Sequence, residues 1–486
     1  MNKPFFCTQL RFLFMLHILA IVTVVILAVG SVHAADRITQ YGIIWTFDKD
    51  YPSGHFCTGD YWVVGPVKIV GITTDLHAPG FAPRPGEDGT MVNPGTDARQ
   101  GYDNRLTSYD VTLNSGLPNG KPVSKENPLV VTADASVVSM VSWLYKSEMD
   151  TEPGTPKFNG GTKAPRPVTR SGAVLTVLKS APPEGSFRPA YAGTDKSIKF
   201  NISHLDKTKL KNLAPVGETP DPAKMLRQIE RPWIDHVNEY LGAMIHPSEN
   251  LPNYGRDLAL LMSQATLLLN VDFTLLPDRP SKDKLLIAVV QFGIDCTGIA
   301  DNGGGWPANG GHALGRKWPI LFAGTILNDP HMKSAGTWKT RFQEDEQTFY
   351  VSQAEVAMTK SAEWRPDKRG GNPTPYKPED IGMAEWGITH TKKPQADNAE
   401  WKATYRGVNG PVFQAFVLCA RIMDQQEAWN HKPLFDYADR WMKISNSGSS
   451  GASSETVAPF VLNMWNAVEA NKGTSQKLAP AAAKAR

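Results

Sequence analysis

The sequence predicts a mixed α+β protein in which a β-sandwich-like domain precedes an all-α domain. Two observations predict this order. Short β-branched and aromatic runs, separated by Asp, Gly, Pro and Asn, fill the chain up to about residue 215. From about residue 216, apolar residues recur at helical spacing instead. We therefore expect a β-rich domain over 35–215 and a helical domain over 216–471, with a signal peptide over 1–34 and a disordered tail over 472–486.

The first domain contains six runs with the composition of strands. These are 43–47, 61–64, 67–72, 129–131, 173–178 and 197–200. Two of the connecting stretches, 79–101 and 152–167, are too long and too rich in Pro and Gly to be hairpins. Each loop either belongs to a binding face or is simply exposed to solvent. The alternative for residues 89–103 is that they reach the neighbouring domain.

The second domain shows helical spacing in several segments. These are 223–245, which Pro232 should kink or divide, 254–269, 319–327, 347–359, 411–423, 434–442 and 454–468. The run 284–292 is apolar on all sides, which predicts an inner element. Residues 364–410 form a long irregular insertion, and their tryptophans favour a functional segment over a disordered one.

The N-terminus has the composition of a secretory signal. Lys3 and Arg11 form a short basic region, an apolar stretch follows over 12–29, and Val32-His33-Ala34 provides a small-residue cleavage site. An uncleaved anchor is the alternative, because 16–29 is long for a signal core. Since no second apolar span follows, we expect cleavage, a secreted or periplasmic location and no stable membrane anchor.

Charge and cysteine content limit the possible partners. Removal of Lys3 and Arg11, in a segment without acids, lowers the formal charge from +3 to +1. A near-neutral chain has no electrostatic footprint for nucleic acid or a membrane surface. The remaining Cys57, Cys296 and Cys419 allow at most one disulfide and have no metal-site spacing, so we expect neither cofactor nor metal.

A glycine-rich segment, 295–316, is the part of the chain that packing explains least. It lies between two apolar runs and contains seven glycines, which permit positive φ angles and close approach to another molecule. Side chains able to stack, hydrogen-bond, carry a proton or neutralise an anion lie between the glycines: Asn302, Trp306, Asn309, His312 and Arg316. The segment is either a ligand loop or a set of turns in which His312 and Arg316 satisfy local carbonyls and an acid.

Several enzyme classes are excluded by missing motifs. The chain lacks a Gly-x-Ser-x-Gly elbow, a phosphate loop and a His-Glu-x-x-His helix, and its glycines do not form a dinucleotide fingerprint. Loop Trp, Tyr, Asn, His and Arg remain, and these side chains suit sugar rings, hydroxyls and carboxylates. An exported protein with these residues is expected to be a polysaccharide enzyme.

Two mechanisms and one non-catalytic role fit these residues. In β-elimination from a uronic acid, Asn, His or Arg neutralises the sugar carboxylate, while Tyr or His transfers protons. In glycoside hydrolysis two carboxylates flank the bond, and Asp295, Asp301 and Glu385 are the candidates. The third alternative is a glycan-binding envelope protein without turnover. Because Arg and His outnumber acid pairs in the glycine-rich segment, the sequence favours the lyase.

The helical region, with Asn302, His312, Arg316 and the Tyr405-Arg406 pair beside a β-domain, resembles polysaccharide lyases of the alginate and glucuronan lyase type. The resemblance implies an incomplete α/α toroid over the helical domain and an acidic polysaccharide as substrate. It also implies His312, Tyr405 and Arg316 as the catalytic group. The residues expected to bind substrate are Asn302, Trp306, Asn309, Tyr254, Arg256, Trp386, His390 and Arg406.

Overall fold

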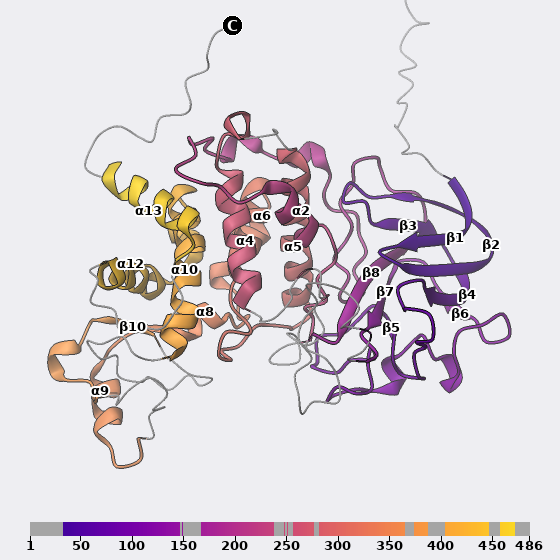
Figure 1. The fold of residues 1–486 in the computed structure, drawn as a ribbon, viewed down its shortest axis with the longest axis horizontal. Coiled ribbons are helices and arrows are strands. Elements are labelled where there is room, and N and C mark those ends of the chain that lie inside the picture. Colours follow the sequence, from indigo (N-terminus) through magenta and orange to yellow (C-terminus); the bar gives the residue numbers. More distant parts are fainter. Residues whose placement is uncertain are drawn as a thin grey trace, which may run out of the picture.

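The computed structural model places one curled β-sheet beside a helical bundle (Figure 1). It describes residues 33–145, 148, 167–237, 247, 250, 256–276, 281–364, 374–386, 404–446 and 457–471. Residues 1–32 of the expected signal peptide, the expected C-terminal tail, Tyr254 and His390 lie outside the described residues. His33 and Ala34, from the expected cleavage site, begin the first strand. In the described part, no helix combines the length and apolar character needed to cross a membrane.

The N-terminal region is built on a single mixed sheet. Its strands are β1 (His33–Gln40), β2 (Ile43–His55), β3 (Tyr61–Val64), β4 (Val67–Thr74), β5 (Thr90–Val92), β6 (Leu129–Val131), β7 (Ala135–Ser142) and β8 (Thr169–Leu178). The order across the sheet is β5-β7-β8-β3-β2-β4-β6, with β1 also paired to β2. Only the β3–β8 pair is parallel among these pairs.

The predicted β-sandwich is wrong, because the described strands form one nearly closed, barrel-like sheet instead of two stacked sheets. The long strand β2 makes this closure possible. Its end at Ser53–His55 pairs with β3, whereas its start at Ile43–Phe47 pairs with β4. β2 therefore pairs with a different neighbour at each end. Because the sheet curls, the strands on both sides of β2 pack around a single core.

Strands β7 and β8 connect the curled sheet to the helices. Because side chains alternate between the two faces of a strand, one set points into the barrel-like core and the other points away from it. Val137 and Leu175 join the core inside the sheet. Val138, Met140 and Val174 join the larger core that the helices share. Both faces of this part of the sheet are thus buried.

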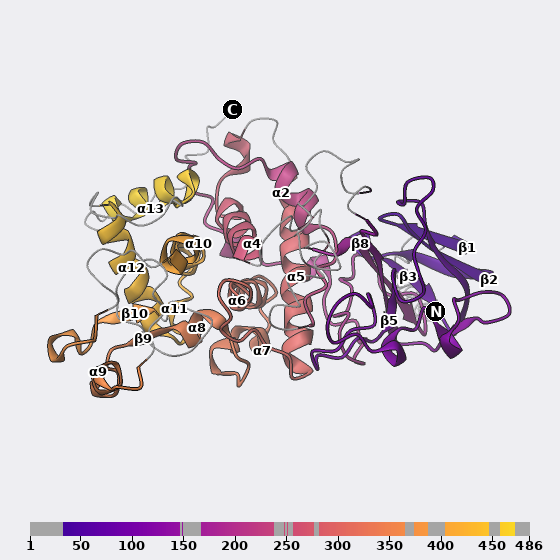
Figure 2. The same ribbon diagram turned by 60° about the horizontal axis from the view of Figure 1, so that its bottom comes forward.

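The helical region begins with α2 (Pro222–Ile229) and ends with α13 (Pro459–Asn471). Between them lie α4 (Arg256–Leu269), α5 (Lys282–Asp301), α6 (Lys317–Ile326), α7 (Pro330–Lys333), α8 (Gln343–Gln347), α9 (Gln353–Lys360), α10 (Thr404–Ile422), α11 (Gln426–Trp429) and α12 (Lys432–Asn446). Helices α2 and α5 lie next to the sheet, and α10, α12 and α13 lie at the opposite end (Figure 2).

The expected all-α incomplete α/α toroid is also wrong. A toroid surrounds a cleft, but the middle of this bundle is filled by α6, whose residues are all buried. Helices α4, α5 and α11 pack against α6. The helical region also contains a small antiparallel sheet of β9 (Thr348–Tyr350) and β10 (Ala384–Trp386), so the class is α+β throughout.

Three predicted segments differ in their boundaries. Helix α5 extends to Asp301, so the first residues of the glycine-rich segment are helical and the loop begins at Asn302. The segment expected as one helix over 347–359 is divided between β9 and α9. Helix α2 ends at Ile229, three residues before Pro232, because proline lacks the N–H that would continue the helix.

A partly buried histidine, His77, connects the Pro-rich loop after β4 to the end of β7. The Nε2 atom of His77 lies 2.7 Å from Asp88 Oδ2, and its Nδ1 atom lies 2.8 Å from Glu148 Oε1. These carboxylates also accept the backbone N–H groups of Ser142 and Leu144, at 2.7 Å and 2.8 Å. Burial alone would lower the pKa of His77, but the two carboxylates outweigh it and raise the pKa to about 9.

This ion triad predicts a stability that decreases in alkaline solution. Because the folded pKa of about 9 exceeds the ordinary 6.5, the contribution is complete below pH 6.5 and is lost as the pH rises through 9. Urea unfolding of wild type and His77→Leu should show a large stability difference below pH 6.5 that shrinks above pH 9. A difference independent of pH would contradict the assignment.

Candidate functional site

The glycine loop, defined here as residues 302–316, is held by side chains of α8. Gln343 Oε1 accepts the N–H groups of Asn309 and Ala313, at 3.3 Å and 3.0 Å. Glu344 accepts those of Gly315 and Lys317, both at 3.3 Å. Burial raises the pKa of Glu344 to about 7. These contacts give the loop backbone the partners that a helix or sheet would otherwise provide.

One glycine in this loop is required by space and by conformation. Gly315 has a φ of +84°, and a Cβ atom there would lie 2.4 Å from the Cβ of Ala259 in α4. A side chain at this position would therefore clash with α4 and strain the backbone. The close approach brings the following residue, Arg316, into the interior.

Arg316 forms a buried ion pair with Asp235. Its Nε and Nη2 atoms donate to the two Asp235 oxygens, both at 2.9 Å, and its Nη1 donates to the Leu314 carbonyl at 2.6 Å. Trp306 Nε1 donates to the same carboxylate at 3.0 Å. Arg316 is 1% exposed. The guanidinium that we expected to neutralise a substrate carboxylate is thus bound by a carboxylate of the protein itself.

The residue after Asp235 is a histidine enclosed by two tyrosines. His236 is 1% exposed, and its ring centroid lies 5.6 Å from that of Tyr102 and 5.7 Å from that of Tyr191, both edge-on. The two ring nitrogens of His236 have no hydrogen-bond partner in the described part of the chain. The same is true of the Tyr102 hydroxyl. The Tyr191 hydroxyl accepts the Asp235 N–H at 2.8 Å. We call His236, Tyr102 and Tyr191 the histidine cluster.

Burial sets the protonation states of the histidine cluster. It lowers the pKa of His236 to about 4, although Asp235 and Asp97 act in the opposite direction. It raises the pKa values of Tyr102 and Tyr191 well above 10.0. At neutral pH the imidazole of His236 is therefore neutral and can accept a proton. The two phenols are protonated and can donate one.

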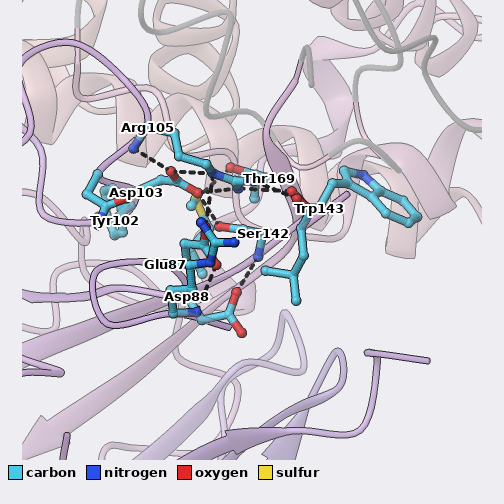
Figure 3. Close-up of polar contacts among 12 residues, drawn as sticks. Glu87, Asp88, Tyr102, Asp103, Arg105, Ser142, Trp143 and Thr169 are labelled. Carbon is cyan, nitrogen blue, oxygen red and sulfur yellow. Dashed lines mark hydrogen bonds and ion pairs between the residues drawn. The ribbon is translucent and has the colours of Figure 1, made fainter. Parts of the chain in front are cut away.

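A polar network fixes the loop that carries Tyr102 (Figure 3). The Tyr102 N–H donates to Gln100 Oε1 at 2.7 Å. The next residue, Asp103, accepts from the Ser142 hydroxyl of β7 at 2.7 Å and from Arg105 Nη2 at 2.6 Å. Asp103 is fully buried, so these bonds are needed to hold its charge in the interior. Tyr102 is thereby anchored to the sheet, although it contacts a residue of the helical region.

A second buried ion pair positions Tyr191. Arg188 donates to both oxygens of Asp295 in α5, at 2.9 Å and 2.6 Å, and its Nε donates to Asp60 of the β2–β3 turn at 2.7 Å. Asp295 also accepts the Tyr191 N–H at 3.3 Å. Burial raises the pKa of Asp295, and the charge of Arg188 opposes the shift. Lys196 donates to the Tyr191 carbonyl at 3.0 Å.

The structure brings together some of the site residues predicted from the sequence. Trp306 and Arg316 meet at Asp235, and His312 is buried in the same loop, with its carbonyl accepting from Arg316 at 3.3 Å. Asn302 forms the exposed end of α5, and its carbonyl accepts from Thr96 at 2.6 Å. The long loop 79–101 therefore does reach the helical region.

Other predicted residues lie elsewhere. Arg256 begins α4 beside Asp257, at 3.5 Å, and Trp386 is buried in β10, where its Nε1 donates to Gln347 at 3.0 Å. Tyr405 and Arg406 belong to the first turn of α10, but their side chains lie outside what the structure describes, as do Tyr254 and His390. The expected meeting of His312 with Tyr405 stays a prediction.

The three carboxylates considered for hydrolysis do not form a pair. Asp295 is bound by Arg188, and Glu385 is buried 3.6 Å from Arg440. Asp301 pairs with His331 at 2.7 Å on the surface. Asp295 and Asp301 lie six residues apart on α5, which separates them by about 9 Å along the helix and places them on different sides. No two of these acids flank a common space.

The histidine cluster was not predicted from the sequence. Residues 233–237 were assigned to a helix, but Pro232 ends the helical pattern and the segment runs into the core without regular structure. Asp235 and His236 stand between the apolar residues Ile234 and Val237. Adjacent ionisable residues inside a short apolar stretch after a proline were the signal available in the sequence.

Comparison with family models, curated proteins and solved structures finds no match for this chain. Among the described residues, no group of His, Cys, Asp and Glu side chains is arranged to hold a metal ion. The interpretation of function therefore depends on the geometry of the histidine cluster and of the residues that support it.

Changing Arg316 tests whether the Arg316–Asp235 pair stabilises the fold around the histidine cluster. Replacing Arg316 with Met leaves the Asp235 carboxylate buried without its counter-charge, which should lower the unfolding free energy by about 3 to 5 kcal/mol. The matched control is Arg99→Met. Arg99 pairs with Asp97 at 2.6 Å but is 53% exposed, so its loss should leave the unfolding free energy close to that of wild type. Equal losses in urea unfolding would contradict a buried structural pair.

Proposed function

We propose that this protein is a secreted or periplasmic enzyme that cleaves a uronate-containing polysaccharide by β-elimination, with the histidine cluster as its proton-transfer group. The observation that supports the proposal is a buried, neutral imidazole with both nitrogens open, lying between two protonated phenols. Structural histidines in a core normally use at least one ring nitrogen in a hydrogen bond. An open acceptor beside open donors suits proton transfer instead.

The proposed reaction uses one base and one acid. His236 takes the proton from C5 of the uronate ring, the C5–H electron pair forms the C4–C5 double bond, and the bond from C4 to the glycosidic oxygen breaks. Tyr102 gives its hydroxyl proton to the leaving oxygen. The imidazolium then loses its proton to water and the phenolate takes one from water, which restores both groups.

In this proposal Arg316 positions the cluster and does not contact substrate. Asp235 is held by Arg316 and Trp306, and its backbone N–H reaches Tyr191, so the pair fixes the segment that carries His236. The negative charge of Asp235 next to His236 also favours the imidazolium formed during the reaction. The lyase is preferred to the hydrolase because the candidate acids do not face one another.

Changing His236 to Gln should abolish product formation. Glutamine keeps polarity and approximate size but does not accept a proton, so kcat on a susceptible uronan should fall at least about 100-fold. Mature protein is incubated with alginate, glucuronan and glycosaminoglycans while the ultraviolet absorbance of the unsaturated product is followed. The matched control is His331→Gln, which changes a surface histidine paired with Asp301 and should leave the rate unchanged. Binding without absorbance in wild type would indicate a glycan-binding protein.

The pH dependence of kcat/KM gives an independent test. Because the pKa of His236 is lowered to about 4, the base is neutral and active above that pH. Activity should fall tenfold for each pH unit below about 4, whereas an ordinary histidine would lose activity below 6.5. A profile whose acidic limb lies near 6.5 would argue against His236 as the base.

A further inference from the structure

A pocket of about 270 Å³ lies at the junction of the sheet and the bundle. The β2–β3 turn, the segment after α2 and one side of α5 form its walls. The residues that line it include Arg188, Trp233, Lys284, Gln291, Phe292 and Asp295. We infer that this pocket is a subsite that binds one uronate ring of the polysaccharide. The inference rests on the proposed function for the sugar class, but the pocket itself is separate from the histidine cluster.

The inner wall of the pocket offers a buried acceptor without a donor. Gln291 is 5% exposed, and its Nε2 donates to the Arg188 carbonyl at 3.1 Å. Its Oε1 atom is buried and has no hydrogen-bond partner in the described part of the chain. A buried amide oxygen without a donor destabilises the folded state. A sugar hydroxyl in this pocket would supply the missing donor.

The rest of the pocket suits the other parts of a sugar ring. Trp233 and Phe292 line it with aromatic surface and pack edge-to-face, with ring centroids 6.0 Å apart. Aromatic rings pack well on the C–H surface of sugars. At the rim, Lys284 is exposed and forms no ion pair with a described residue. The charges that line the pocket balance overall, because Asp60 and Asp295 bind Arg188 and because Glu230 and Arg231 have opposite signs. The exposed ammonium group of Lys284 is therefore the group that a uronate carboxylate would meet.

The pocket also lies close to the proposed reaction centre. Trp233 precedes His236 by three residues in one buried segment. Asp295 lines the pocket and accepts the N–H of Tyr191, a member of the histidine cluster. A ring bound here would occupy the position of a neighbouring sugar on the same chain. The pocket should therefore contribute to KM more than to kcat.

The test is calorimetric titration of the mature protein with sodium D-glucuronate and, separately, with D-glucose. Gln291→Leu should weaken the binding of both sugars at least tenfold. Because leucine also removes the donor to the Arg188 carbonyl, circular dichroism should first show that the variant is folded at the titration temperature. Lys284→Gln, a surface change that leaves folding intact, should weaken glucuronate alone. Gln414→Leu is the matched control. Gln414 is a buried glutamine in α10 with its Oε1 also unpartnered among described residues, but it does not line this pocket.

The outcomes separate the subsite from the catalytic proposal. Wild-type protein that binds neither sugar, or Gln291→Leu and Lys284→Gln proteins that bind glucuronate like wild type, would overturn the subsite. Binding that depends on Gln291 without any unsaturated product would support the subsite and reject β-elimination. Product formation with an unchanged KM in Gln291→Leu would reject the subsite alone.

Discussion

The structure depends on charges buried where the curled sheet meets the bundle. Arg188 stands at this junction with Asp60 of the sheet on one side and Asp295 of α5 on the other. A buried guanidinium is tolerated only when its donors are matched, and here they bind both carboxylates and the Pro189 carbonyl. Because removing any member would leave a buried charge uncompensated, the triad fixes one relative placement of sheet and helices. The triad also positions the pocket, which its three residues line, and Tyr191, whose N–H donates to Asp295.

The glycine loop has a different role from the one its composition suggested. Its backbone is bound by the side chains of α8, and its Trp306 and Arg316 point inward to Asp235. Gly315 permits this backbone path, because a Cβ atom at that position would clash with α4. The loop thus holds Asp235, the residue next to His236, in place. His236 itself lies in the segment after Pro232, and Tyr102 and Tyr191 lie in two loops of the sheet region. Function in the proposal is shared between both parts of the chain.

The patterns in the sequence identified elements more reliably than their assembly. Five of the six expected strands exist, and 61–64 and 129–131 have the expected bounds, whereas 197–200 is not a strand. Several expected helices exist with shifted ends. The architecture of each region was wrong for the same reason. Closing one sheet through β2 and filling the bundle with α6 both depend on contacts between distant segments. Alternation and helical periodicity describe only which face of an element is buried, not what covers it.

The sequence by itself determined the α+β class, the order of the two regions and a loop whose glycines and polar side chains require a special conformation. Only the tertiary structure decided which ionisable groups are bound and which are open. Arg316 and His236 are both basic side chains in the sequence, but a carboxylate 2.9 Å away binds one, whereas two phenol rings surround the other. The availability of a side chain for chemistry depends on its neighbours in space, and those neighbours come from positions more than 40 residues away along the chain.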